Sequence, residues 1–180
     1  MVITDDDRKR FLTEDFYNSL RYMFEGAIAW EAWKLSKGSA RHQGVLGMYT
    51  VFMEARALYE FIHSHKLPLR FPDEARADDF ASPPWQAKKS AVYSHYMDNK
   101  KPANKRMFHL VYRRSKTTGP AGELNEQVLN VTKDLLYLSQ EFVTNINDDD
   151  LRALGEKALQ DATNEAQKAA DHYGITNPLV

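Results

Sequence analysis

The feature that most restricts the fold is the segment of residues 45–62, eighteen residues of which only three are charged. At 100° per residue, its apolar side chains gather on one face of a helix. We therefore expect this helix to be among the most buried in the protein. Arg56 and His63 fall together at the margin of the apolar face, about two turns apart.

Arg56 is expected to be a buried cation with an obligatory negative partner. A guanidinium does not give up its proton, and burying an unpaired charge costs on the order of several kcal/mol. A carboxylate, a ring of acceptors or a phosphate would satisfy it. An internal ion pair with Asp78, Asp79 or Glu54 is the structural interpretation, and a bound phosphate is the functional one.

The composition is that of an ordinary globular domain. A chain of 180 residues can bury roughly 70% of the surface that its unfolded form exposes. The 24 basic and 25 acidic residues leave a net charge of −1, which argues against a broad nucleic-acid-binding face. Without cysteine, disulfides, thiol catalysis and thiolate zinc sites are excluded. Neither a signal-peptide pattern nor a membrane-spanning apolar run is present, so we expect a cytoplasmic protein.

The spacing of apolar residues predicts four long helices, at about residues 4–36, 41–65, 124–142 and 149–173. In the third, apolar residues follow one another by four, three, four, three and four positions, as in the seam of a helix bundle. Thr4 and the three aspartates after it are typical of a helix N-terminus, and Gly174 of a helix end. The predicted fold class is all-α, a bundle of about four long helices in one domain, residues 1–180.

A long proline-rich connection is predicted between the second and third long helices. Four of the seven prolines lie in residues 66–85, where they remove backbone donors and disfavour helix at the preceding residue. Short helices are expected at about residues 72–80, 86–97 and 102–114, followed by a flexible loop at 115–122. A connection of this length in a compact domain is more often functional or packed than idle.

Arg56 and His63 form the first candidate site. Their Cα atoms are expected roughly 10 Å apart along one edge of the helix. Arginine can hold a phosphate with two hydrogen bonds, and histidine can move a proton near neutral pH. Together they could support cleavage of RNA by its own 2′-hydroxyl. In the alternative interpretation, Arg56 forms an internal ion pair and His63 ends the helix among polar neighbours.

The second candidate site is the segment of residues 100–116, which holds seven lysines and arginines in a chain that is neutral overall. Lys105, His109 and Arg113 are four positions apart, so a helix would align them in one stripe, with Tyr112 beside it. Such a stripe could bind phosphate or nucleic acid. The alternative is a solvated face of a peripheral helix.

The third candidate site is the acidic loop that leads to Trp85. Asp79 could pair with Arg56 or, with nearby histidines, bind a divalent metal. No helix has the paired glutamate and histidine spacing of di-iron bundles, and helix capping explains the acidic residues, so we expect neither metal nor cofactor. Trp85 is expected to anchor the loop or the core. A small-ligand pocket lined by Trp85, Tyr59 and Arg56 is a further possibility.

Three segments, MEARALYEFI (residues 53–62), DDFASPPW (78–85) and NKRMFHLVYRR (104–114), resemble a pattern of an uncharacterised bacterial all-α family. The expected helical arrangement is also similar to the HEPN superfamily (higher eukaryotes and prokaryotes nucleotide-binding). Its active members are metal-independent ribonucleases that use an arginine and a histidine separated by four to six residues. Arg56 and His63 match that spacing, whereas Ala57 stands where active members carry a polar residue.

The resemblance implies an RNA-cleaving or RNA-binding protein. Arg56 would steady the scissile phosphate, while His63 or His109 would act as general acid or base. Lys105 and Arg113 would attract the RNA. HEPN enzymes commonly complete their site across a dimer, so the resemblance also implies a homodimer.

A competing hypothesis is a non-catalytic helical interaction module, such as one member of a defence or toxin–antitoxin pair. In that case Arg56 and Asp79 would form a structural ion pair, and removing Arg56 would cost roughly 3 kcal/mol of stability.

Overall fold

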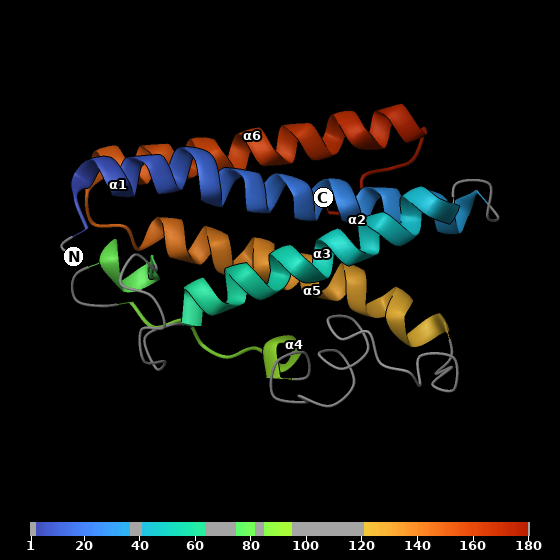
Figure 1. Cartoon of the computed structure of the whole chain (residues 1–180), viewed down its shortest axis with the longest axis horizontal. Coiled ribbons are helices and arrows are strands. Elements are labelled where there is room, and N and C mark those ends of the chain that lie inside the picture. Colours follow the sequence, from blue (N-terminus) through green and yellow to red (C-terminus); the bar gives the residue numbers. More distant parts are fainter. Residues whose placement is uncertain (1–2, 37–40, 64–74, 82–84, 95–120, 180) are drawn as a thin grey trace.

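Residues 3–36, 41–63, 75–81, 85–94 and 121–179 are described by the computed structural model of the chain (Figure 1). The long helical segments are α1 (Asp5–Arg10) with its continuations η1 (Phe11–Phe16) and α2 (Tyr17–Leu35), then α3 (Arg41–His63), α5 (Ala121–Thr144) and α6 (Asp149–Tyr173). Two short elements, η3 (Ala77–Asp79) and α4 (Ala91–Tyr93), lie between α3 and α5. These ranges contain no strand, so the predicted all-α bundle of four long helices is confirmed.

The first helical segment begins at a capping box, as its sequence predicts. The Thr4 hydroxyl accepts the Asp7 N–H at 3.2 Å, and the Asp7 carboxylate accepts the Thr4 N–H at 3.0 Å. Hydrogen bonds from the Thr4 hydroxyl and backbone hold the pKa of the Asp7 carboxyl below its usual value. The helix then continues without a break through η1, a π-helical turn, into α2.

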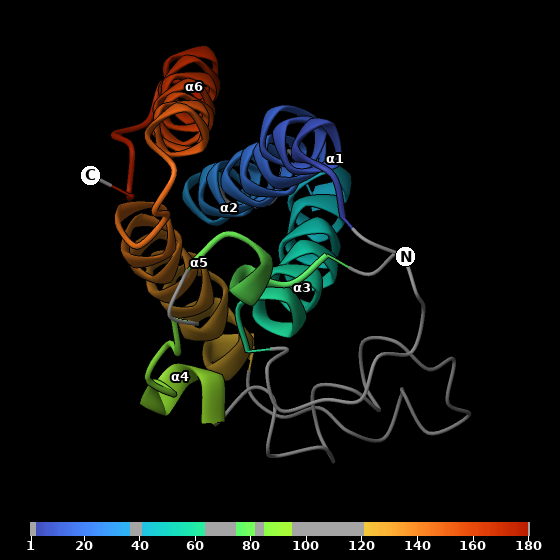
Figure 2. The ribbon, with the colours of Figure 1, turned by 90° about the vertical axis from the view of Figure 1, so that its left-hand side faces the viewer.

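The bundle is organised around α2, which contacts α3, α5 and α6. Figure 2 shows α6 and α3 on different sides of α2, with α5 beneath. Gly26 of α2 and Gly47 of α3 meet where these two helices cross. A Cβ atom on Gly47 would lie 2.4 Å from the Gly26 carbonyl oxygen, and one on Gly26 would lie 2.6 Å from that of Gly47. The two backbones are therefore in direct contact.

The helix α5 contributes the seam that the sequence predicts. Its described seam residues are all buried: Val128, Val131, Leu135, Leu138 and Phe142. The helix begins at Ala121, inside the predicted loop of residues 115–122. The stable seam that follows offsets the low helix propensity of Gly122, which explains the earlier start.

The helix α6 spans the predicted range, residues 149–173. The Asp148 side chain accepts the Leu151 N–H at its start, and Gly174, with φ of 64°, ends it. The buried face of α6 carries little side-chain volume, because most of its buried residues are alanines: Ala158, Ala162, Ala166 and Ala170. This helix lies at the edge of the bundle, as expected (Figure 2).

The short helices of the connection differ from their predicted ranges. Arg76 has an extended backbone, so the helix predicted at 72–80 is, in its described part, the single 3₁₀ turn η3. The helix predicted at 86–97 begins only at Ala91, because the Ser90 hydroxyl accepts the Tyr93 N–H at 2.8 Å and caps it there. The helix predicted at 102–114 lies outside the described residues.

Candidate functional site

Arg56 lies at the surface edge of α3, so the expectation of a buried cation is wrong. Its side chain is 39% exposed, and its Nε donates to Glu60 Oε1 at 2.9 Å. Glu60 is on the next turn of the same helix and is 31% exposed. The expectation failed because no helix of the described ranges covers one face of α3, and Arg56 borders that face instead of the core.

Asp79 and Trp85 have structural roles in the described part of the connection. The Asp79 carboxylate accepts the Arg76 N–H at 2.8 Å and caps η3. With Arg56 bound to Glu60, the predicted Arg56–Asp79 ion pair is replaced by two local contacts. The Trp85 ring lies 6.0 Å from that of Phe142, so Trp85 anchors the connection on the core, as expected.

Phe142 belongs to a cluster of aromatic rings at the end of the bundle where η1, α3, η3 and α5 meet. The cluster joins Phe11, Phe16, Phe61, Phe80 and Phe142, with ring centroids 4.7 to 6.3 Å apart. It holds η3 against the long helices, and so brings the connection to the C-terminal end of α3, where His63 lies.

His63 is buried between aromatic rings. Only 4% of its surface is exposed, its ring centroid lies 4.1 Å from that of Tyr93, and the ring stacks at 6.3 Å on that of Tyr59. His63 is the last residue of α3, and among the described residues its ring contacts these two tyrosines. In the described structure His63 is a packing residue between α3 and α4.

Asp134 of α5 is the centre of a polar cluster beside His63. Its Oδ2 accepts the Tyr59 hydroxyl at 2.6 Å and the Ser90 hydroxyl at 2.7 Å. Lys89 lies over the Tyr93 ring, with Nζ 5.0 Å from the centroid. One carboxylate thus joins α3, α5 and the connection, although residues 59, 90 and 134 are far apart in sequence.

Asp134 and Ser90 were not among the functional residues predicted from the sequence. A signal was present for Asp134, because it is an acidic residue directly before Leu135 of the seam, at the edge of a predicted buried face. Nothing local marks its partners, since hydrogen bonds between distant segments leave no pattern in the sequence.

The hydrogen-bond directions decide what this cluster can do chemically. In a serine hydrolase, a histidine accepts the serine proton and an acid orients the histidine. Here the Ser90 hydroxyl donates directly to Asp134 and accepts a backbone N–H. These hydrogen bonds therefore position Ser90 as a helix cap and hold the Tyr59 hydroxyl against Asp134. They do not activate the Ser90 hydroxyl as a nucleophile.

The remaining predicted site residues, Lys105, His109, Tyr112 and Arg113, lie outside the described residues. Their proposed binding of phosphate or RNA stays a prediction. Within the described ranges, no group of three or more acidic or histidine residues is arranged to hold a metal ion. No helix of the described structure is long and apolar enough to cross a membrane.

An apolar stripe runs along the uncovered face of α3. It consists of Leu46, Thr50, Met53 and Ala57, which we call the α3 stripe. Leu46 and Met53 are 66% and 60% exposed, and Ala57 is also exposed. Arg56 and Glu60 flank the stripe on one side. Exposed apolar surface of this kind, bordered by polar residues, is typical of a protein interaction site.

Comparisons with models of known protein families, with curated proteins and with solved structures find no match for this chain.

Proposed function

We propose that the protein is a non-catalytic helical interaction module that binds through the α3 stripe. The observation that carries this proposal is the exposure of two large apolar side chains, Leu46 and Met53, on one face of a helix whose other face is core. The stripe extends over twelve residues, from 46 to 57, and the eleven steps between them correspond to about 16 Å of helix. That length suits contact with another helix.

The surroundings of the predicted catalytic pair support a structural role. A general acid or base must reach the proton that it transfers, and His63 is almost fully buried against Tyr59 and Tyr93. Arg56 Nε donates to Glu60 on the same helix, so part of the guanidinium is held in a local ion pair. These contacts favour the interaction module over the ribonuclease.

The pattern of the stripe favours a second copy of this chain as the partner. If two α3 helices pair antiparallel about a two-fold axis, Leu46 of one copy faces the small Ala57 of the other, and Met53 faces Thr50. Large side chains then meet small ones at each position, which allows close packing. At each end Glu60 falls opposite the exposed His42 and Gln43, which offer it hydrogen-bond donors.

Sedimentation velocity tests the proposal directly. The wild-type chain is expected to pass from monomer to dimer between about 5 and about 500 µM, since a single-helix interface is small. Met53→Glu puts a charge in the centre of the interface and should weaken association at least about tenfold. Tyr137→Glu is the matched control, because Tyr137 is similarly exposed on α5.

Two outcomes would contradict the proposed interface. The first is a monomer throughout the concentration range. The second is an equal effect of Met53→Glu and Tyr137→Glu on the dissociation constant.

An RNA-cleavage assay distinguishes this proposal from the HEPN-like ribonuclease. The ribonuclease hypothesis expects metal-independent cleavage that is lost in Arg56→Gln while the melting temperature is unchanged. The interaction module expects no cleavage by either protein. Cleavage by the wild type that depends on Arg56 would replace the present proposal.

A further inference from the structure

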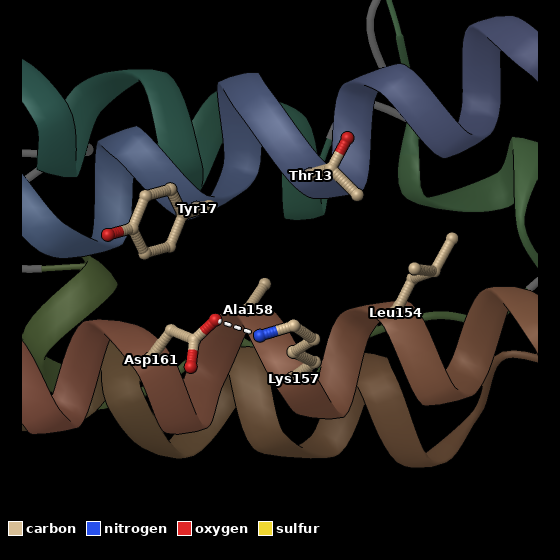
Figure 3. A pocket seen from close by; sticks show the side chains of 6 residues that line it. All are labelled: Thr13, Tyr17, Leu154, Lys157, Ala158 and Asp161. Atoms are coloured by element: carbon tan, nitrogen blue, oxygen red, sulfur yellow. Dashed lines mark hydrogen bonds and ion pairs between the residues drawn. The ribbon is translucent and has the colours of Figure 1, made fainter.

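A cleft separates the first helical segment from α6 on the side of α2 away from α3 (Figure 3). Its volume is about 270 Å³. Six residues line it: Thr13, Tyr17, Leu154, Lys157, Ala158 and Asp161. Thr13 and Lys157 are exposed residues, so the cleft opens to solvent.

The cleft coincides with the π-helical turn η1. Thr13 lies in that turn, and Tyr17 is the first residue of α2 directly after it. A π-helical turn has an extra residue and a wider backbone than an α-helical turn, and such turns occur frequently at functional sites. Opposite it, α6 presents the small side chain of Ala158, which does not fill the space.

The walls of the cleft combine apolar surface with a neutralised charge pair. The Tyr17 ring, Leu154 and Ala158 supply the apolar part (Figure 3). Lys157 Nζ donates to Asp161 Oδ2 at 2.5 Å, so each charge already has its counter-ion. A charged ligand would have to compete with that pair, whereas a neutral hydrogen-bonding group can use its remaining donors and acceptors.

We infer that this cleft binds a small neutral aromatic molecule that carries one hydrogen-bonding group. Its ring would lie against Tyr17 and Ala158, and its polar group would face Lys157 and Asp161. The volume is that of about nine water-sized groups, which sets the approximate number of non-hydrogen atoms. This inference is independent of the proposed function, because it involves α6 and not the α3 stripe.

Indole has about that many non-hydrogen atoms and one N–H donor, and it serves as the probe. Titration followed by amide NMR should give saturable shifts at Leu154 and Ala158, with a dissociation constant of about 1 mM. Benzoate and benzylammonium, which carry opposite charges, should each bind at least about tenfold more weakly.

Variants place the binding in this cleft. Ala158→Leu fills it and should abolish the shifts, while Tyr17→Ser removes the aromatic wall and should weaken binding at least about fivefold. Ala158 is buried, so Ala158→Leu can prevent folding. In that case Tyr17→Ser alone tests whether indole binds in this cleft. Gln160→Leu is the control, since Gln160 is exposed on α6 and lines a different groove, between α5 and α6.

The inference is overturned if indole gives no saturable shift, or if its affinity is unchanged in Tyr17→Ser. Equally tight binding of either charged probe would overturn the assignment to neutral ligands.

Discussion

The contact between Arg56 and Glu60 shows how a nearby residue on the same helix satisfies a charge without help from the core. The same spacing and order recur at Arg21 and Glu25 on α2, where Nε and Oε1 are 2.8 Å apart. In both pairs the cation precedes the anion by four residues, which is the less favourable order for a helix. Exposed pairs of this kind contribute little to stability.

We therefore expect a weak coupling between Arg56 and Glu60. A double-mutant cycle with Arg56→Ala and Glu60→Ala, followed by urea denaturation, should give a coupling energy of about 0.3 kcal/mol. The Arg21–Glu25 cycle is the control, because its side chains are similarly exposed. A coupling well above 1 kcal/mol for the Arg56 pair alone would contradict this expectation.

At the scale of the helices, two glycines set the distance between α2 and α3. Each would place a Cβ atom within 2.6 Å of the other's carbonyl oxygen, so neither position accepts a side chain unless the helices move apart. Gly155 of α6 provides a contrast. Its Cβ atom would meet the side chain of Val143 at 3.0 and 3.2 Å, and a side chain can shift more readily than a backbone.

Alanine substitutions should separate these two kinds of contact. Gly47→Ala is expected to lower the free energy of unfolding by about 2 kcal/mol, because overpacking outweighs the gain in helix propensity. Gly155→Ala should change the free energy of unfolding by less than about 1 kcal/mol. The gain in helix propensity is the same as for Gly47→Ala, and it offsets the smaller steric clash with the Val143 side chain. Chemical denaturation measures both, and equal effects of the two substitutions would contradict the backbone contact.

For the molecule as a whole, Asp134 joins segments that are distant in sequence. Its carboxylate holds Tyr59 of α3 and Ser90 of the connection, 75 and 44 positions away. Tyr59 has no exposed surface, so its hydroxyl cannot turn to water when the acceptor is lost. The connection is thus attached to the bundle by a hydrogen-bond acceptor as well as by aromatic packing.

Loss of this acceptor should destabilise the protein and loosen the connection. Asp134→Ala is expected to lower the free energy of unfolding by about 2 to 3 kcal/mol, because a buried hydroxyl is left unsatisfied. Hydrogen exchange at the Tyr93 amide should become faster. Lys133→Ala, at an exposed neighbouring position, should stay within about 0.5 kcal/mol of the wild type. Equal effects of the two substitutions would show that Asp134 has no such role.

The helices could be predicted from sequence because the interactions that form them are local. The capping box at Thr4, the seam of α5 and the αL cap at Gly174 each involve residues a few positions apart. The first, second and fourth long helices consequently appear close to their expected ranges. The prediction was poorer for α4 and η3, where single caps at Ser90 and Asp79 set the bounds of very short elements.

Tertiary structure alone decided which side chains are covered and which distant groups meet. Apolar spacing identified the core face of α3 but not whether a second helix covers its margin, so Arg56 was expected inside and lies at the surface. The partners of Asp134, the Gly26–Gly47 contact and the cleft beside η1 likewise arise from helices far apart in the chain. Periodicity describes one helix, whereas the covering of a face depends on how several helices pack, and that arrangement leaves no local pattern to read.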